Sequence, residues 1–122
     1  MYVITYMVEL DAQDEAYAEG TPLVDLFGDG ARAKMLSVFA TQRDREFNVA
    51  ELARQAGISR KTAYDHIDDL AELGVVRERE VSQGKRYSYN TDSDVARKLY
   101  ELNGATLRRR QELRDDVEAP DR

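Results

Sequence analysis

The 122-residue sequence contains no cysteine and no tryptophan, and its only histidine is His66. The lack of cysteine excludes disulfides, thiolate metal sites, thiol nucleophiles and thiol redox switches. A single histidine also excludes a metal centre built from several histidines of one chain. We therefore expect no metal and no cofactor.

Long apolar runs are absent as well. No run approaches the roughly 18 residues that a membrane-spanning helix needs. Residues 1–10 lack the basic start and the small-residue cleavage site of a signal peptide. We expect a cytoplasmic protein that makes no contact with a membrane.

Basic residues are missing from the first 30 positions, which carry seven acidic ones. Residues 31–110 hold 16 basic and 12 acidic residues, and residues 111–122 hold two and five. The net charge of the whole chain is −6, which disfavours binding to a polyanion. Residues 31–110 are mildly basic, however, and are compatible with such a partner. Fourteen arginines against four lysines, with frequent aspartate, resemble the composition of a cytosolic protein from an extreme halophile. The alternative is an ordinary acidic protein.

Residues 1–29 are expected to form an acidic N-terminal extension. Within it, residues 2–10 are rich in β-branched and aromatic side chains and predict a strand that packs on the domain or on a second subunit. A short helical turn follows Pro22, and the glycines at positions 28 and 30 end it.

Residues 30–91 show three helical segments in succession. The predicted helices cover residues 30–41, 48–57 and 60–73, with Asp29, Asn48 and Ser59 as their N-caps. Glu51 completes a capping box with Asn48, and Gly57 supplies a turn of positive φ. Residues 41–47 are predicted to be a charged loop.

The hydrophobic period then changes from 3.6 to 2. Residues 75–81 and 86–90 predict two strands joined by a tip at residues 82–85. A capping-box signal at residues 91–94 predicts a C-terminal dimerisation helix over residues 92–117, kinked or split at Asn103-Gly104, and residues 118–122 are expected to fray. The predicted dimerisation residues are Val95, Leu99, Leu102 and Leu107.

This order is that of a helix-turn-helix followed by a β wing. Residues 31–90, about half the chain, resemble the winged helix-turn-helix of bacterial and archaeal transcriptional regulators. The matching residues are Glu51-Leu52-Ala53, Ala56-Gly57-Ile58-Ser59, Thr62-Ala63, His66-Ile67, Leu70 and Leu73-Gly74-Val75-Val76. The resemblance implies an α+β fold that is mostly α with a small β wing. With the acidic ends and the lack of cysteine, the chain is also similar to haloarchaeal winged-helix regulators of the oxidative-stress response.

The helix at residues 60–73 is the expected recognition helix. Ala63, Ile67 and Leu70 fall on its buried face, so its first two turns project outward. The DNA-binding residues predicted on it are Ser59, Arg60, Lys61, Thr62, Tyr64 and Asp65. Arginine and lysine can read guanine in the major groove, and the hydroxyls suit phosphate oxygens. The acids of its later turns would repel phosphates.

Arg79, Lys85 and Arg86 are the wing residues predicted to contact DNA. The alternative is that these cations are solvated and neutralised by Glu78 and Glu80. His66 is expected to pack or to donate to a phosphate.

We expect a homodimeric, sequence-specific transcriptional regulator of double-stranded DNA, with potassium or similar ions at the acidic DNA interface. The alternative is a winged-helix protein–protein interaction module of a transcription or replication assembly. Asp68 and Asp69 do not resemble a catalytic pair, because neighbouring helical side chains point about 100° apart, and we expect no enzyme.

Overall fold

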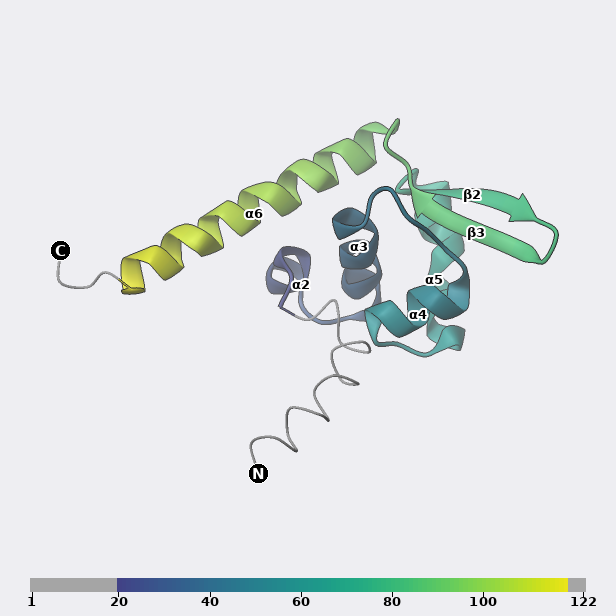
Figure 1. Cartoon of the computed structure of the whole chain (residues 1–122), viewed down its shortest axis with the longest axis horizontal. Coiled ribbons are helices and arrows are strands. Elements are labelled where there is room, and N and C mark those ends of the chain that lie inside the picture. Colours follow the sequence, from purple (N-terminus) through teal and green to yellow (C-terminus); the bar gives the residue numbers. More distant parts are fainter. Residues whose placement is uncertain (1–19, 119–122) are drawn as a thin grey trace, which may run out of the picture.

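The computed structural model describes residues 20–118, which form five helices and a three-stranded antiparallel sheet (Figure 1). The elements are α2 (Pro22–Phe27), α3 (Ala31–Thr41), β1 (Glu46–Phe47), α4 (Val49–Ala56), α5 (Arg60–Glu72), β2 (Val76–Val81), β3 (Gly84–Tyr89) and α6 (Asp94–Glu118). The predicted α+β class is confirmed, and the arrangement is compatible with a winged helix. The strand predicted at residues 2–10 lies outside the described residues, as does most of the predicted tail at 118–122.

The core lies between α3, α4, α5 and one face of the sheet. Phe39 and Phe47 are fully buried there, with their rings edge to face at a centroid distance of 5.7 Å. Phe47 belongs to β1, which pairs with β3 and so makes the sheet order β1-β3-β2. The prediction of a loop throughout residues 41–47 was therefore wrong at its end. The buried Phe47 side chain anchors this segment in the core, so Glu46 and Phe47 pair with β3 as a short strand.

The helix caps mostly follow the local sequence. The Asn48 side chain accepts from the Glu51 backbone N–H at 2.8 Å, and the Glu51 carboxylate accepts from the Asn48 N–H at 3.0 Å, so the predicted capping box is confirmed. Gly57 has a φ of 75°, and Ser59 caps α5. The prediction for Asp29 was wrong, because Gly30 is the N-cap of α3 and no side chain caps that helix.

The loop between α5 and β2 and the turn between β2 and β3 are both tight. Only Ser82 and Gln83 separate β2 from β3. Gly84 has a φ of 130°, a conformation that favours glycine, and this lets β3 begin directly after a two-residue turn. The predicted four-residue tip was thus too long, and Lys85 lies inside β3, opposite Glu80.

The C-terminal helix α6 is continuous over 25 residues and extends away from the rest of the molecule (Figure 1). The Ser93 hydroxyl accepts from the Ala96 N–H at 3.0 Å, so the helix starts later than residue 92 and the cap is not the predicted box at 91–94. The predicted break at Asn103-Gly104 is absent: Asn103 is buried, and one glycine costs a helix only about 1 kcal/mol. None of the helices within residues 20–118 has the length and apolar character that crossing a membrane requires.

Polar contacts help to hold α6 to the body. The Tyr89 hydroxyl donates to the Ala96 carbonyl, and Arg110 Nε lies 2.9 Å from the Asp25 carboxylate on α2. Burial raises the pKa of Tyr89 to about 12, so this hydroxyl remains a donor over the whole neutral range.

Candidate nucleic-acid interface

The first two turns of α5 project from the body. Ala63, Ile67 and Leu70 are at most 2% exposed and fix the inner face of the helix, as the sequence predicts. The outer face carries the exposed residues Arg60, Lys61, Tyr64 and Asp65. Within it the Lys61 side chain is 87% exposed, and its ammonium lies 3.6 Å from the Asp65 carboxylate.

Ser59 and Thr62 already serve the helix start. The Ser59 hydroxyl accepts from the Thr62 N–H at 3.0 Å and donates to the Thr62 hydroxyl at 2.8 Å. These two groups therefore cap α5, and their remaining lone pairs and the free backbone N–H groups face solvent at the positive end of the helix dipole.

A hollow of about 500 Å³ separates α5 from the β2–β3 hairpin, and we refer to it as the α5–hairpin groove. It is lined by Asn48, Val49 and Ala50 of α4, by Arg60, Tyr64, Ile67 and Asp68 of α5, and by Gln83, Gly84, Lys85 and Tyr87 of the hairpin. The structure thus brings three predicted site residues, Arg60, Tyr64 and Lys85, around one groove. Asp68, which the sequence did not single out as a site residue, lies among them.

Lys85 is held at this groove by Glu78. The Lys85 ammonium lies 3.2 Å from the Glu78 carboxylate, and this contact, with a smaller contribution from Asp68, raises the pKa of Lys85. The lysine is therefore charged at neutral pH, and its side chain remains 46% exposed.

Arg79 and Arg86 lie on the other face of the hairpin. Lys85 and Arg86 are neighbours in β3, so their side chains point to opposite faces, and Arg79 sits directly opposite Arg86 in the strand register. The two predicted wing arginines are thus not brought to the α5–hairpin groove.

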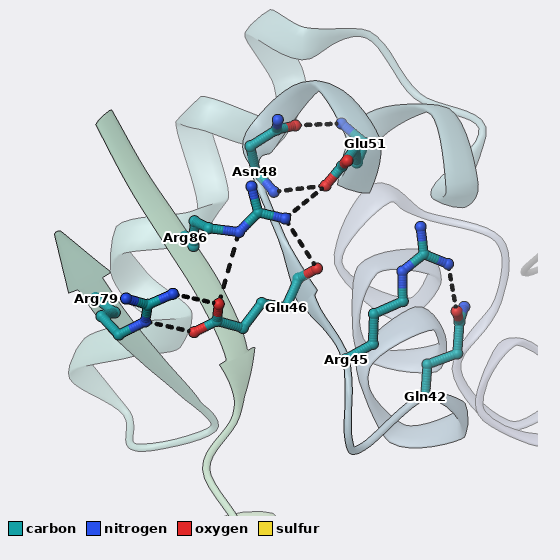
Figure 2. Close-up of polar contacts among 7 residues, drawn as sticks. All are labelled: Gln42, Arg45, Glu46, Asn48, Glu51, Arg79 and Arg86. Carbon is teal, nitrogen blue, oxygen red and sulfur yellow. Dashed lines mark hydrogen bonds and ion pairs between the residues drawn. The ribbon is translucent and has the colours of Figure 1, made fainter. Parts of the chain in front are cut away.

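Glu46 of β1 pairs with both arginines (Figure 2). Arg79 donates to the two Glu46 carboxylate oxygens at 2.7 Å each, and Arg86 Nε lies 3.6 Å from one of them. Arg86 also donates to the Glu51 carboxylate at 3.3 Å. We call Glu46, Arg79, Arg86 and Glu51 the Glu46 clamp.

The alternative drawn from the sequence was that Glu78 and Glu80 neutralise the wing cations. For Arg79 and Arg86 these are the wrong acids. Glu78 pairs with Lys85, whereas the partners of Arg79 and Arg86 are Glu46 and Glu51. The hydrogen bond from Arg79 lowers the pKa of Glu46 and raises that of Arg79. The apolar Phe47 beside Glu46 was the only local signal of a strand there, and it did not indicate which arginines Glu46 would meet.

The later acids of α5 have different surroundings. Arg32 of α3 binds Asp69 and also donates from Nε to His66 Nδ1 at 3.0 Å. His66 therefore accepts a hydrogen bond from a helix of the body. Within the described residues, no group of three or more histidine, cysteine or acidic side chains could hold a metal ion.

The predicted dimerisation residues do not form one stripe on α6. Val95, Leu102 and Leu107 are 39–52% exposed, while Leu99 packs partly against the core. Val95 and Leu102 are seven residues apart and share a side, but Leu107 lies about 140° around the helix from Leu102. Leu113, eleven residues beyond Leu102 and 47% exposed, falls on the same side as Leu102.

Comparison with known proteins gives one match. Residues 36–120 match a family of unknown function (DUF7342), a range that includes most of α3 and all later elements. No curated protein and no solved structure matches the chain.

Proposed function

The chain belongs to the DUF7342 family of unknown function, and we propose that it is a winged helix-turn-helix protein that binds double-stranded DNA sequence-specifically to regulate transcription. The observation that carries this proposal is the α5–hairpin groove. An exposed helix start bearing Arg60 and Lys61 stands across that groove from Lys85, on an otherwise acidic chain.

In this proposal α4 and α5 are the helix-turn-helix, and the β2–β3 hairpin is the wing. Arg60 and Lys61 read base edges in the major groove, with Tyr64 and Asp65 beside them. Ser59, Thr62 and the start of α5 face a phosphate, and Lys85 contacts the backbone from the wing. The proposal places the protein with the DNA in the cytoplasm and gives it no catalytic role.

The proposed protein acts as a homodimer, because one short recognition helix reads few base pairs and two reach adjacent half-sites about 34 Å apart. Exposed leucines along α6 support this state. A part in the oxidative-stress response rests on the sequence resemblance alone.

Fluorescence anisotropy with genomic fragments in concentrated potassium chloride tests the function. We expect one class of fragment to bind much more tightly than shuffled DNA. Arg60→Ala or Lys61→Ala should cost about 1–3 kcal/mol on that fragment and relax the preference. Lys98→Ala is the matched control, since Lys98 is an exposed cation on α6 far along the chain. Binding without any preference, or no binding, would contradict the proposal and favour a protein–protein interaction module.

A further inference from the structure

The Glu46 clamp joins the β2–β3 hairpin to two adjacent elements, β1 and α4, that lie far earlier in the sequence. Glu46 comes from β1, Arg79 and Arg86 come from the hairpin, and Glu51 comes from the first turn of α4 (Figure 2). The Glu51 oxygen that accepts from Arg86 also accepts from the Asn48 N–H. A continuous set of polar contacts therefore connects the hairpin to the start of α4.

The clamp has a rigid base. Phe47, the next residue after Glu46, is fully buried and pairs with Tyr87, while Glu46 itself pairs with Ser88. The Glu46 backbone is thus fixed on the sheet edge, and Arg86 Nη2 also reaches the Glu46 carbonyl at 3.4 Å. The side chains of Glu46, Glu51 and Arg86 are only 30–33% exposed, which limits their screening by solvent.

Electrostatics explains why the hairpin needs this carboxylate. Arg79 and Arg86 are direct cross-strand partners, and like charges in that position destabilise a strand pair, since their Cβ atoms lie only about 4.5–5.5 Å apart. Glu46 pairs with both guanidinium groups and so removes that repulsion. Arg79 binds the Glu46 carboxylate through two parallel hydrogen bonds, the bidentate geometry that arginine also uses for phosphate.

We propose that Glu46 is a positioning residue for DNA binding: it neutralises Arg79 and Arg86 and fixes the hairpin so that Lys85 stays opposite α5. This inference rests on the proposed function. The sequence predicted that Arg79 and Arg86 contact DNA. In this inference they instead support Lys85, the hairpin residue that contacts DNA. This inference also predicts an effect opposite to simple electrostatics, because removal of an acid from a DNA-binding protein ordinarily strengthens binding.

The experiment compares two variants that lose the same charge. Glu46→Gln removes the clamp, whereas Glu80→Gln removes an exposed acid of the same hairpin whose strand partner is Lys85. We expect Glu46→Gln to weaken binding of the preferred DNA about threefold to tenfold, the cost of ordering a few loosened side chains on binding. Glu80→Gln should leave binding unchanged or make it slightly tighter.

A coupled variant separates positioning from direct contact. In Glu46→Gln/Arg79→Gln one of the two opposed cations is gone, so we expect affinity to return toward that of Arg79→Gln alone. If Glu46→Gln does not fold, recovery of the fold in the double variant tests the same coupling. Tighter DNA binding by Glu46→Gln, equal to that of Glu80→Gln, would overturn the inference. So would a double variant weaker than either single one, since Arg79 would then touch DNA.

Hydrogen exchange on the free protein distinguishes failure of this inference from failure of the proposed function. The β2–β3 amides should exchange faster in Glu46→Gln than in Glu80→Gln, while those of α4 and α5 do not change. Equal exchange in the two variants would refute the clamp whether or not the wild-type protein binds DNA. Faster exchange with no DNA binding by the wild type would refute only the function.

Discussion

At the scale of the residue, Glu46 is the carboxylate whose protonation has the clearest structural consequence. Its charge is the shared partner of Arg79 and Arg86, and the Arg79 hydrogen bond lowers its pKa below the ordinary value of 4.5. A group with a lowered pKa in the folded state contributes stability above its unfolded pKa. That contribution disappears as the pH falls through the folded pKa.

The prediction concerns the thermal midpoints of the wild-type protein and Glu46→Gln as a function of pH. We expect the wild type to be more stable above pH 4.5, where both its folded and unfolded forms carry the Glu46 charge. Below that pH the difference should shrink toward zero, because a protonated glutamate and a glutamine are nearly equivalent. Differential scanning calorimetry at fixed salt measures it. A difference that stays constant down to the acid limit of folding would mean that the charge of Glu46 is irrelevant to stability.

At the scale of the element, α6 carries more exposed large apolar side chains than any other helix of the described residues. It is 25 residues long, about 37 Å at 1.5 Å per residue, and its C-terminal end extends beyond the body (Figure 1). Val95, Leu102 and Leu113 share one side, and each is 39–52% exposed. The α6 helix of a second copy of the chain would bury this row of apolar side chains.

We therefore predict a homodimer of about twice 13.9 kDa in sedimentation equilibrium, held by this side of α6. Leu102→Lys/Leu113→Lys should dissociate it without loss of helical content, because both residues are solvent-facing in the single chain. Leu107→Lys is the control, since Leu107 is equally exposed but lies on another side of the helix. Dissociation by the control alone would place the interface elsewhere, and a monomeric wild type at micromolar concentration would exclude the dimer.

Local rules predicted most of the elements and failed where distant residues meet. The capping box at Asn48, the turn at Gly57 and the buried face of α5 each depend on residues within about one helical turn or two, and each was predictable. Glu46 lies 33 residues from Arg79, so no pattern within a helix or strand could pair them. Lys85 was predicted in the hairpin tip, so alternation could not be applied to it. Once the short turn places Lys85 in β3, its side chain and that of Arg86 point to opposite faces, and which face meets α5 depends on the packing of the sheet.

The same distinction holds along α6. Helical periodicity placed Val95 and Leu102 on one side, and the structure agrees. Leu107 was predicted to belong with them, although its angular position on the helix differs from that of Leu102 by about 140°. The absence of a break at Gly104 shows that the cost of one glycine, about 1 kcal/mol, does not interrupt this helix even beside Asn103.

At the scale of the whole molecule, a net negative charge coexists with a small cluster of basic residues. The net charge is −6, yet Arg60, Lys61 and Lys85 lie at or beside one groove. Asp68 lines that groove with them, whereas Asp69 is paired with Arg32 of α3. In the proposed complex, Asp68 rather than Asp69 is therefore the later acid of α5 that faces a bound phosphate.

This arrangement predicts an unusual salt dependence of DNA affinity. Ordinary binding releases counterions and weakens steeply with salt, but in molar salt the Debye length is only about 3 Å and that gain is small. An acidic surface approaching DNA must instead retain cations, and potassium between Asp68 or Asp65 and a phosphate would supply the missing positive charge. We expect a shallow, absent or inverted slope between about 0.5 and 3 M potassium chloride.

Three matched aspartate variants locate the origin of this slope. Asp68→Asn should shift it toward ordinary counterion release, because the carboxylate that retains the cation is gone, and Asp65→Asn should do so to a smaller extent since Lys61 lies 3.6 Å from Asp65. Asp69→Asn should leave the slope unchanged, because Arg32 already neutralises that side chain. Titrations of all three variants over the same salt range measure the effect. A steep loss of affinity in the wild type, unaltered by Asp68→Asn, would mean that these acids only hydrate the surface and take no part in binding.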